Sequence, residues 1–451
     1  MAKARLASRA ERRARGRALR ERCPRRSHAT WKPPADRGDP VQLVLEGDTG
    51  RLPQLVSLRH GRMIRTPFTF YRGAALHMAA DLARTPTTGL RVQACGDAHL
   101  ANFLVFATAE RRAIFDIHDL DETLPAPWEW DVKRLATSFV LASRDGGIGE
   151  ARAKEAARAC ARSYREHVAE LAELRVLDVW YASLLADDLL RAIEDAATRA
   201  RTEERVATEL ARAAALHGFP KLTGASHGAP AIRDAPPTLF HLHRMDAVFR
   251  EAFEQYRLTL TPARRTVLDR FQVRDFAIKV VGVGSVGTVC AVILLMTGDG
   301  DPLFLQVKEA RASVLEPYAG KSAYPSHGQR VVVGHHLMQS ASDMFLGWAR
   351  TSGGRHFYVR QLRDVKIKPP VERLDPGQMT RYAEWCGHSL ARAHARSGDP
   401  AAISGYLGRA ETFDDAIADF AVAYADQAER DHDLLRKAAR KGRLKVLVER
   451  A

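Results

Sequence analysis

A run of strand-like segments, interrupted by a glycine string, lies inside a chain whose pattern is otherwise mostly helical. Phe276 to Val281 reads F-A-I-K-V-V, Val289 to Met296 reads V-C-A-V-I-L-L-M, and Leu303 to Lys308 reads L-F-L-Q-V-K. Short apolar, β-branched runs predict strands, whereas Ala-, Leu-, Arg- and Glu-rich stretches with little Gly or Pro predict helices. Strands and helices that occupy separate parts of a chain predict an α+β fold.

The glycine string between the first two strands is G-V-G-S-V-G-T-V, from Gly282 to Val289. A G-x-G-x-x-G string that binds a dinucleotide precedes a helix, but here an apolar β-branched run follows. A glycine loop that joins two strands is the form that covers nucleotide phosphates in protein kinases. The alternative is a hairpin turn that needs glycine only for its backbone angles. On the first interpretation, Gly282, Gly284, Ser285 and Gly287 bind the nucleotide.

Lys308 ends the third strand-like run, twenty-one residues after Gly287. A lysine in this position of a kinase contacts the nucleotide phosphates and is itself held by a carboxylate. We therefore predict that Lys308 has a catalytic and nucleotide-binding role. Glu316 is the preferred carboxylate partner over Glu309, because adjacent residues on a strand point to opposite faces.

The segment Gly96 to Phe103, G-D-A-H-L-A-N-F, places Asp97 five residues before Asn102, with His99 between them. In phosphotransferases an Asp at this spacing orients the acceptor hydroxyl, and the Asn holds a metal ion on the nucleotide phosphates. The alternative is an ordinary turn, since Asp and Asn often bond to their own backbone. The pattern predicts Asp97 and His99 as catalytic residues and Asn102 as a metal ligand.

Four carboxylates, Asp116, Asp119, Asp121 and Glu122, crowd into the string F-D-I-H-D-L-D-E. Like charges at this density repel one another unless a divalent cation binds between them. The alternative is an acidic turn that caps the next element. We predict a metal ligand here. Asp119 is preferred, and Asp116 and Asp121 are the alternatives.

Charge is unevenly spread along the 451 residues, whose formal net charge is +15. Residues 1–40 hold thirteen Lys or Arg and four Asp or Glu, and the preferred interpretation is a solvated, partly helical arm that docks on the folded body. No aromatic-rich surface accompanies the arm, so a nucleic-acid partner is not expected. Five cysteines without a C-x-x-C pair fit a reducing compartment, and no apolar run is long enough to cross a membrane. The expected location is the cytoplasm.

The chain is expected to divide at changes of pattern. The predicted parts are a basic arm (1–40), a part with the Asp97 loop and metal site (41–148), a helical insertion with a loop at 218–237 (149–244), a β-rich part that covers the nucleotide (245–370) and a C-terminal helical part (371–451). Within them we predict strands at 91–95 and 357–362, a hairpin of 103–106 with 113–117, and helices at 70–85 and 130–143. Residues 149–240 are expected to pack on the helical part.

Several long strings resemble one family. F-Y-R-G-A-A (70–75), G-D-A-H-L-A-N-F, the string F-D-I-H-D-L-D-E-T-L-P-A-P-W-E-W-D-V-K-R-L-A, V-V-G-V-G-S-V-G-T, R-Q-L-R-D-V-K (360–366) and L-A-R-A-H-A-R-S-G-D (390–399) are all similar to it. It is the uncharacterised bacterial domain-of-unknown-function family number twenty-two fifty-two. The resemblance covers nearly the whole chain from about Arg17, but the family has no settled activity to transfer.

More distantly, the motifs resemble the protein-kinase-like superfamily, in particular its aminoglycoside and choline phosphotransferase branch. That resemblance implies that Asp97 is the catalytic Asp, Asn102 and Asp119 are metal ligands, and Asp131 is a buried Asp that orders the loop. The chain departs from that branch at Cys95, which stands where the loop's first His would be. The glycine loop and lysine also follow the Asp97 loop instead of preceding it. The resemblance therefore implies a two-lobed, kinase-like fold with a circularly permuted order.

The leading functional hypothesis is an ATP- and Mg²⁺-dependent phosphotransferase that acts on an unidentified small-molecule or protein acceptor. A second hypothesis keeps the same cleft but transfers AMP, in which case basic residues such as Arg72, Lys279 and Arg360 should surround it. A third is a non-catalytic nucleotide-binding scaffold. The pair of Asp97 and Asn102 argues against it, because simple binding needs neither residue.

Overall fold

The computed structural model describes residues 6–193, 195–214, 222–226, 229–362 and 366–449. Residues 1–5 of the basic arm, 218–221 and 227–228 of the predicted loop, and 363–365 of the R-Q-L-R-D-V-K string lie outside the described residues.

The first half of the chain is mostly helical. Its elements are α1 (Arg9–Arg22), η1 (Arg25–Ala29), α2 (Pro40–Glu46), α3 (Pro53–Met63), α4 (Pro67–Gly73), α5 (Ala75–Leu82), β1 (Arg91–Ala94), η2 (Leu100–Asn102), β2 (Phe103–Ala107), β3 (Ala113–Ile117), β4 (Leu124–Pro127), α6 (Trp128–Asp145), α7 (Glu150–Leu171), α8 (Val176–Tyr181), α9 (Ala186–Arg191) and α10 (Ala196–Ala214).

The second half begins with most of the strands and ends in helices. Its elements are β5 (Thr223–Ser226), β6 (Ala229–Ile232), β7 (Leu239–Phe240), η3 (His243–Met245), α12 (Asp246–Thr259), α13 (Pro262–Leu268), β8 (Gln272–Lys279), β9 (Cys290–Met296), β10 (Pro302–Glu309), α14 (Glu316–Ala319), α15 (His327–Met338), β11 (Gly347–Arg350), β12 (His356–Gln361), β13 (Lys366–Ile367), η4 (Val371–Arg373), α16 (Pro376–Ser397), α17 (Pro400–Leu407) and α18 (Thr412–Arg440).

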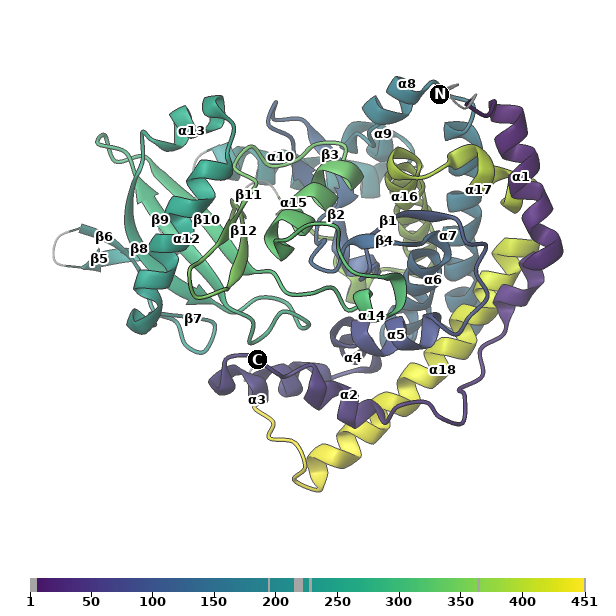
Figure 1. Ribbon diagram of the computed structural model, residues 1–451, viewed down its shortest axis with the longest axis horizontal. Helices are drawn as coiled ribbons and strands as arrows, with labels where there is room; N and C mark the ends of the chain where they lie inside the picture. The colour runs from purple at the N-terminus through teal and green to yellow at the C-terminus, as the bar shows by residue number, and fades with distance from the viewer. Residues whose placement is uncertain (1–5, 194, 215–221, 227–228, 363–365, 450–451) are drawn as a thin grey trace, which may run out of the picture.

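A six-stranded antiparallel sheet has the order β11-β12-β10-β9-β8-β7 and lies on one side of the molecule (Figure 1). Successive side chains on a strand point to opposite faces. Leu305 and Val307 of β10 therefore join the apolar core that the sheet shares with α12. Gln306 and Lys308 point to the other face, where α15 packs beside Tyr358. This alternation directs the lysine away from the apolar core of the sheet.

Long helices form a second and larger apolar core on the other side of the molecule (Figure 1). α6, α7, α16 and α18 pack against one another there, and buried residues of β1, β3 and β4 join them. The core unites residues from before and after the six-stranded sheet, so the helical body is assembled from distant parts of the chain. α7 lies inside this core, although the sequence analysis assigned it to the insertion 149–244.

Most of the predicted elements are confirmed: the three strands around the glycine string, the strands at 91–95 and 357–362, the β2–β3 hairpin and the helix that begins near Trp130. The helix predicted for 70–85 is instead two helices, α4 and α5, which meet at Ala74 (φ −113°, ψ 34°). The described residues between 222 and 240 do not pack on the helical body as expected. Leu222 and Ile232 contact Val292 of the sheet, and β7 pairs with β8.

The basic arm is docked through α1, which packs along α17. A Cβ atom at Gly16 would lie 1.9 Å from the carbonyl oxygen of Ala402, so the two helices approach to backbone contact. Arg12 and Arg15 of α1 pair with Asp399. Part of the arm's positive charge is thus neutralised by ion pairs with the folded body.

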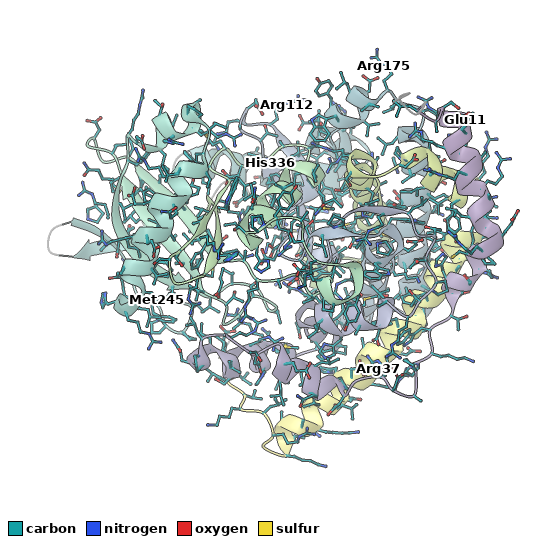
Figure 2. All side chains as sticks on the ribbon, in the orientation of Figure 1. Glu11, Arg37, Arg112, Arg175, Met245 and His336 are labelled. Carbon is teal, nitrogen blue, oxygen red and sulfur yellow. The ribbon has the colours of Figure 1, made fainter. Side chains whose placement is uncertain are left out.

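Arg37, on the segment that leads to α2, forms ion pairs with Asp81 and Asp431 and is labelled in Figure 2. All three side chains are nearly buried. The segment therefore ties α5 to α18. In the described part of the chain, no helix combines the length and apolar character needed to span a membrane.

Because α1 is docked, we predict that Gly16→Ala lowers the stability of the protein, whereas the same substitution in a free arm would raise the stability of the helix. In a free helix Gly16→Ala would stabilise by about 1 kcal/mol, because alanine is the better helix former. Against Ala402 the added methyl group must displace backbone, and we expect the free energy of unfolding to fall by roughly 1–3 kcal/mol in urea denaturation. Gly353→Ala, where a Cβ atom meets nothing within 4 Å, is the control and should change little. A more stable Gly16→Ala variant would show that the arm does not dock.

Candidate functional site

The Asp97 loop leaves β1 through a turn that only glycine can make. Gly96 has a φ of +78°, and a Cβ atom there would lie 2.6 Å from the carbonyl oxygen of Glu122. Side chains disfavour both the positive φ and the close approach. The turn therefore places the loop directly against the carboxylate segment 119–122.

Asp131, in the first turn of α6, holds the start of the Asp97 loop through backbone hydrogen bonds. Its Oδ2 accepts a hydrogen bond from the N–H of Cys95 (2.6 Å) and its Oδ1 one from the N–H of Gly96 (3.0 Å). His394 Nε2 of α16 lies 3.1 Å from Oδ2, and its Nδ1 bonds to the hydroxyl of Tyr164 on α7. The predicted ordering role of Asp131 agrees with these contacts, which tie the loop to three helices.

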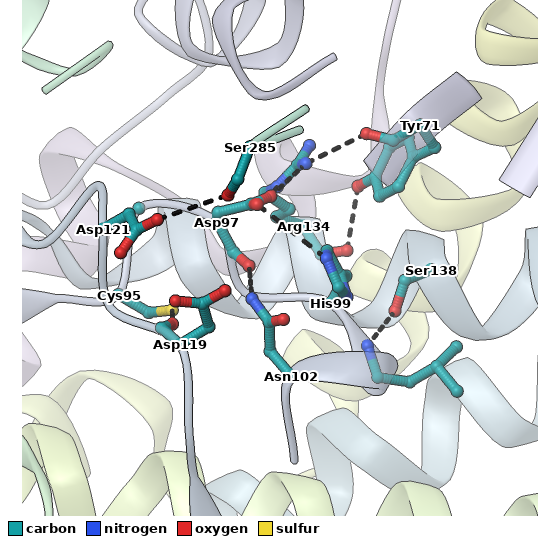
Figure 3. Close-up of polar contacts among 12 residues, drawn as sticks. Tyr71, Cys95, Asp97, His99, Asn102, Asp119, Asp121, Arg134, Ser138 and Ser285 are labelled. Carbon is teal, nitrogen blue, oxygen red and sulfur yellow. Dashed lines mark hydrogen bonds and ion pairs between the residues drawn. The ribbon is translucent and has the colours of Figure 1, made fainter. Parts of the chain in front are cut away.

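Asp97 lies at the cavity wall and is held by Arg134, one helical turn after Asp131 (Figure 3). Arg134 Nε donates to Asp97 Oδ1 at 2.9 Å, and its Nη2 contacts the same oxygen. Burial raises the pKa of Asp97 to about 6, and the charge of Arg134 opposes that rise. Because Oδ1 receives both contacts, Oδ2 is the oxygen left to interact with a ligand.

Asn102 and His99 both lie next to Asp97, but only Asn102 lines the cavity. Asn102 Nδ2 donates to the backbone oxygen of Asp97 (2.8 Å), which fixes the amide plane with its Oδ1 as the remaining acceptor, and Asn102 lines the cavity. His99 is buried beside the ring of Phe68, with its Nε2 3.8 Å from Asp97 Oδ2, and is not among the residues that line the cavity. Burial lowers the pKa of His99 well below its ordinary value, so the ring is neutral.

Lys308 meets the carboxylate segment. Its Nζ lies 3.0 Å from Asp119 Oδ1 and 2.6 Å from Asp121 Oδ2, although 189 residues separate Lys308 from Asp119. Burial alone would lower the pKa of Lys308, but the two carboxylates outweigh it and raise that pKa well above its ordinary value. Burial would raise the pKa of Asp119, yet Lys308 and Arg360 lower it below the usual range. Lys308 and Asp119 are therefore charged at neutral pH.

Two of the predicted carboxylates lie elsewhere. Asp116 is fully buried and accepts hydrogen bonds from Arg392 (2.6 Å) and from the N–H of Ser340 (2.8 Å), away from the cavity wall. Its place at the interior of β3 turns it towards α16. Glu316 begins α14 and lies beside His327, so it is not the partner of Lys308. Asp119 and Asp121 take that position instead.

The glycine loop rests on the segment that joins α2 to α3. Arg51 donates to the carbonyl oxygens of Gly284 (2.8 Å) and Val286 (2.6 Å), and the N–H of Leu52 donates to Gly287 O (2.7 Å). Ser285 Oγ lies 3.4 Å from Asp121 Oδ2 (Figure 3). The loop is thus held between the N-terminal helices and the carboxylate segment.

These parts enclose a cavity of about 430 Å³. Asp97, Asn102, Asp119, Asp121 and Glu122 line one side, and Gly284, Ser285 and Thr288 of the glycine loop line another. Residues of α2 to α5 and of the segment after β10 complete the wall. Lys308 lies behind the Asp119 and Asp121 carboxylates.

Arg72 of α4 also lines the cavity and has no ionic partner among the described residues. Its Nε atom is buried without a hydrogen-bond partner, and its guanidinium lies 5.9 Å from the ring centre of Phe68. Burial lowers the pKa of Arg72, while the charges of Asp97 and Glu372 oppose that change. An anion bound in the cavity would satisfy this guanidinium.

Comparison with known families gives one match. The family described as "Uncharacterized protein conserved in bacteria (DUF2252)" matches residues 51–438. The chain belongs to the DUF2252 family. Comparisons with curated proteins and with solved structures found no match. The matched range includes the Asp97 loop, the carboxylate segment, the glycine loop and Lys308, so every part of the cavity described above except the residues before 51 belongs to the DUF2252 region.

The described residues of this DUF2252 chain contain no group of three or more His, Cys, Asp or Glu side chains arranged to hold a metal ion. Mg²⁺ needs fewer protein ligands, because it retains waters and shares phosphate oxygens of a substrate. Asp119, Asp121 and the Asn102 amide supply oxygen atoms of the kind that Mg²⁺ prefers. These residues fit a metal ion that is also bound by a substrate better than they fit a metal ion held by protein ligands alone.

Sequence reasoning missed Arg134, Arg51 and His394 as parts of the site. The signal for Arg134 was present in W-E-W-D-V-K-R-L-A, since residues three apart on a helix share a face and Asp131 was already placed on the loop side. Arg51 belongs to no motif, and its role depends on how α2 and α3 pack on the glycine loop. His394 reaches Asp131 only through the packing of α16.

The contacts of Asp131 predict a large loss of stability on its removal. Asp131→Ala leaves two buried N–H groups without acceptors, and we expect the free energy of unfolding to fall by roughly 2–6 kcal/mol. Asp415→Ala, which removes an exposed ion pair with Arg158, should cost less than about 1 kcal/mol in the same urea titration. An Asp131→Ala variant as stable as the control would mean that the carboxylate does not hold the loop.

Proposed function

We propose that this DUF2252 protein is an ATP- and Mg²⁺-dependent phosphotransferase that acts on an acceptor held beside Asp97. The observation that carries the proposal is the pair of contacts from Lys308 to Asp119 and Asp121 at the wall of the cavity that Asp97 and Asn102 share. Phosphoryl transfer requires a lysine, metal-binding oxygens and an acceptor-orienting Asp around one triphosphate. Three separate segments, the Asp97 loop, the carboxylate segment and β10, carry these groups.

The order of elements supports a kinase-like interpretation of the β-rich part. The glycine loop joins two paired strands, Lys308 lies on the next strand, and helix α15 follows before two more strands. In kinases the corresponding lysine is on the third strand and the helix after it carries a Glu partner. α15 contains no acidic residue, so Asp119 and Asp121 supply the negative charge instead.

We further propose that the kinase-like lobes occur in permuted order. The Asp97 loop and the carboxylate segment precede the glycine loop, whereas α16 follows it and supplies His394 to Asp131. The helical core therefore closes around residues from both sides of the β-rich part. A cleft depends on where groups lie in space, so the order of segments along the chain does not affect the chemistry.

The cavity has the size and chemistry for a nucleotide. Its volume falls within the range of small-molecule sites, and its wall has backbone of the glycine loop on one side. On another side lies Arg72, a cation that has no ionic partner within the described part of the chain. Asn102, Asp119 and Asp121 would hold Mg²⁺, which would neutralise charge on the transferred group. Asp97 Oδ2 would orient the acceptor hydroxyl, since Arg134 holds Oδ1. Positioning by these groups would supply most of the rate.

Transfer of AMP from the same cleft is a second candidate, and the position of Arg72 favours it. Of the three basic residues expected around such a cleft, Arg72 lines the cavity, whereas Arg360 is buried behind it and bonds to His118 O and Gln306 Oε1. A cation close to the glycine loop could hold a terminal phosphate when the nucleotide binds in reverse. Incubation with ATP labelled on the α- or the γ-phosphate separates the two: γ-label on the acceptor means kinase activity, and α-label means AMP transfer.

We predict that Lys308→Met and Asp119→Asn each lower Mg·ATP turnover by roughly 10²–10³-fold, because each removes a charge that acts on the transferred group. Release of labelled phosphate measures turnover. Lys321→Met, at an exposed position, is the matched control and should keep full activity.

Lys308→Arg retains the positive charge and should keep a folded protein if Lys308→Met proves unstable. Melting temperatures are recorded for every variant. Folded variants with unchanged turnover would contradict the role of Lys308 and Asp119, as would a wild-type protein that neither binds nor turns over Mg·ATP with any acceptor.

Arg72→Ala should weaken the binding of Mg·ATP without lowering the stability of the protein. Loss of a guanidinium that contacts phosphate should weaken Mg·ATP binding by roughly tenfold or more in calorimetric titration. The melting temperature should not fall, because the side chain has no ionic partner to lose and its buried Nε is unsatisfied. Arg350→Ala, on the exposed end of β11, serves as the control. A variant that melts lower and binds nucleotide normally would assign Arg72 to structure.

A further inference from the structure

A second cavity, of about 300 Å³, lies between α10, α16 and the three-stranded sheet β13-β2-β3. It shares no lining residue with the cavity that contains Asp97. Its volume lies at the lower end of the range for small-molecule sites. No step of the proposed function uses it.

The interior of this cavity is apolar. Phe115 of β3, Leu190 and Ile193 near α9, Val206 of α10, and Trp385 of α16 are among the side chains that line it. Several of them form one apolar cluster that continues around the cavity. A ligand body of hydrocarbon or aromatic character would remove this surface from water.

Three guanidinium groups, from Arg201, Arg205 and Arg381, belong to the same lining, and none of the described residues that line the cavity is Asp or Glu. Arg201 donates to Thr198 Oγ1 (3.1 Å) and Arg205 to the backbone oxygen of Lys368 (2.8 Å), so both use uncharged partners and keep further N–H donors. Arg381 forms no ion pair with a described residue. The cavity therefore combines an apolar interior with a positively charged edge.

Asp195 does not line the cavity, but its carboxylate carries a charge that interacts with those of Arg201 and Arg381. Its Oδ2 accepts the N–H of Thr198 (2.7 Å) at the start of α10. Hydrogen bonds from Thr198 lower the pKa of Asp195, and the charges of Arg201 and Arg381 add to that effect. Among the described groups named here, Asp195 interacts with two of the three guanidinium groups, so the edge carries more positive than negative charge.

We propose that this cavity binds an amphipathic carboxylate, with an acyl or aryl body among the apolar side chains and its carboxylate on Arg201 and Arg381. Guanidinium groups pair with carboxylates in a planar, two-bond arrangement, which gives both affinity and orientation. Inorganic phosphate would satisfy the arginines but leave the apolar interior unfilled. A neutral alcohol of the same length as the carboxylate would fill the apolar interior but leave the arginines without a charged partner.

The wall of this site is continuous with the Asp97 loop. The hydroxyl of Tyr382, which lines the cavity, donates to the backbone oxygens of Leu100 (2.7 Å) and Phe103 (2.8 Å). Phe115 lies in the strand that leads to the carboxylate segment. The ligand is nevertheless bound by groups that have no part in phosphoryl transfer, so the proposal goes beyond the proposed function.

Calorimetric titration of the full-length protein with octanoate, octanol and inorganic phosphate, without nucleotide, tests the site. Octanoate should bind roughly tenfold to hundredfold more tightly than octanol, because a charged hydrogen bond is worth that difference, and inorganic phosphate should not displace octanoate. Arg381→Gln should weaken octanoate by roughly tenfold and leave octanol unchanged. Arg409→Gln, elsewhere on the surface, is the matched control.

Leu190→Trp should fill the cavity and abolish octanoate binding, and its melting temperature shows whether it folds. Equal affinity for octanoate and octanol, unchanged octanoate affinity in Arg381→Gln, or displacement of octanoate by inorganic phosphate would each overturn the proposal. Self-association that octanoate does not reverse, seen by sedimentation, would also overturn it, since a second copy would then cover the cavity. The titration needs no nucleotide, so a failure of the proposed phosphotransferase function leaves its outcome unaffected.

Discussion

The ion pairs of Lys308 with Asp119 and Asp121 join the two apolar cores of this protein at one point. Lys308 is 2% exposed, and an ammonium group so buried persists only with opposite charge beside it. The alternation along β10 turns the lysine out of the sheet core, and the Gly96 turn brings the Asp97 loop against the segment that supplies the carboxylates. The cavity depends on this meeting of charges.

Segments that are far apart in the sequence hold the two loops that border the cavity. Asp131 of α6 carries the loop, and His394 of α16 fixes Asp131, so helices from both ends of the matched DUF2252 region hold one turn. On the other side Arg51 holds the glycine loop, and the C-terminal segment reaches α3 through the N–H of Leu447 bonded to Ser57 O (2.8 Å). Neither loop that borders the cavity is held by local contacts alone.

The sequence predicted the local elements well where their patterns were long. The strands around the glycine string followed from short apolar, β-branched runs, and the helix near Trp130 followed from its helical pattern. Choices among nearby carboxylates could not follow from spacing. Asp116 and Asp119 stand three residues apart, yet one is buried against Arg392 and the other faces Lys308. The contribution of Arg72 likewise depends on how α4 packs against the loops, which no local pattern encodes.

The central claim is that Lys308, Asp119 and Asn102 surround one metal-bound nucleotide. Diffraction from crystals grown with Mn²⁺ and a non-hydrolysable ATP analogue, recorded at the manganese absorption edge, locates the metal without any assumption about the acceptor. The account predicts an anomalous peak within coordination distance of Asp119 and Asn102, with phosphates beside Lys308 and under the glycine loop. A nucleotide bound elsewhere, or a metal with no ligand among these residues, would contradict it.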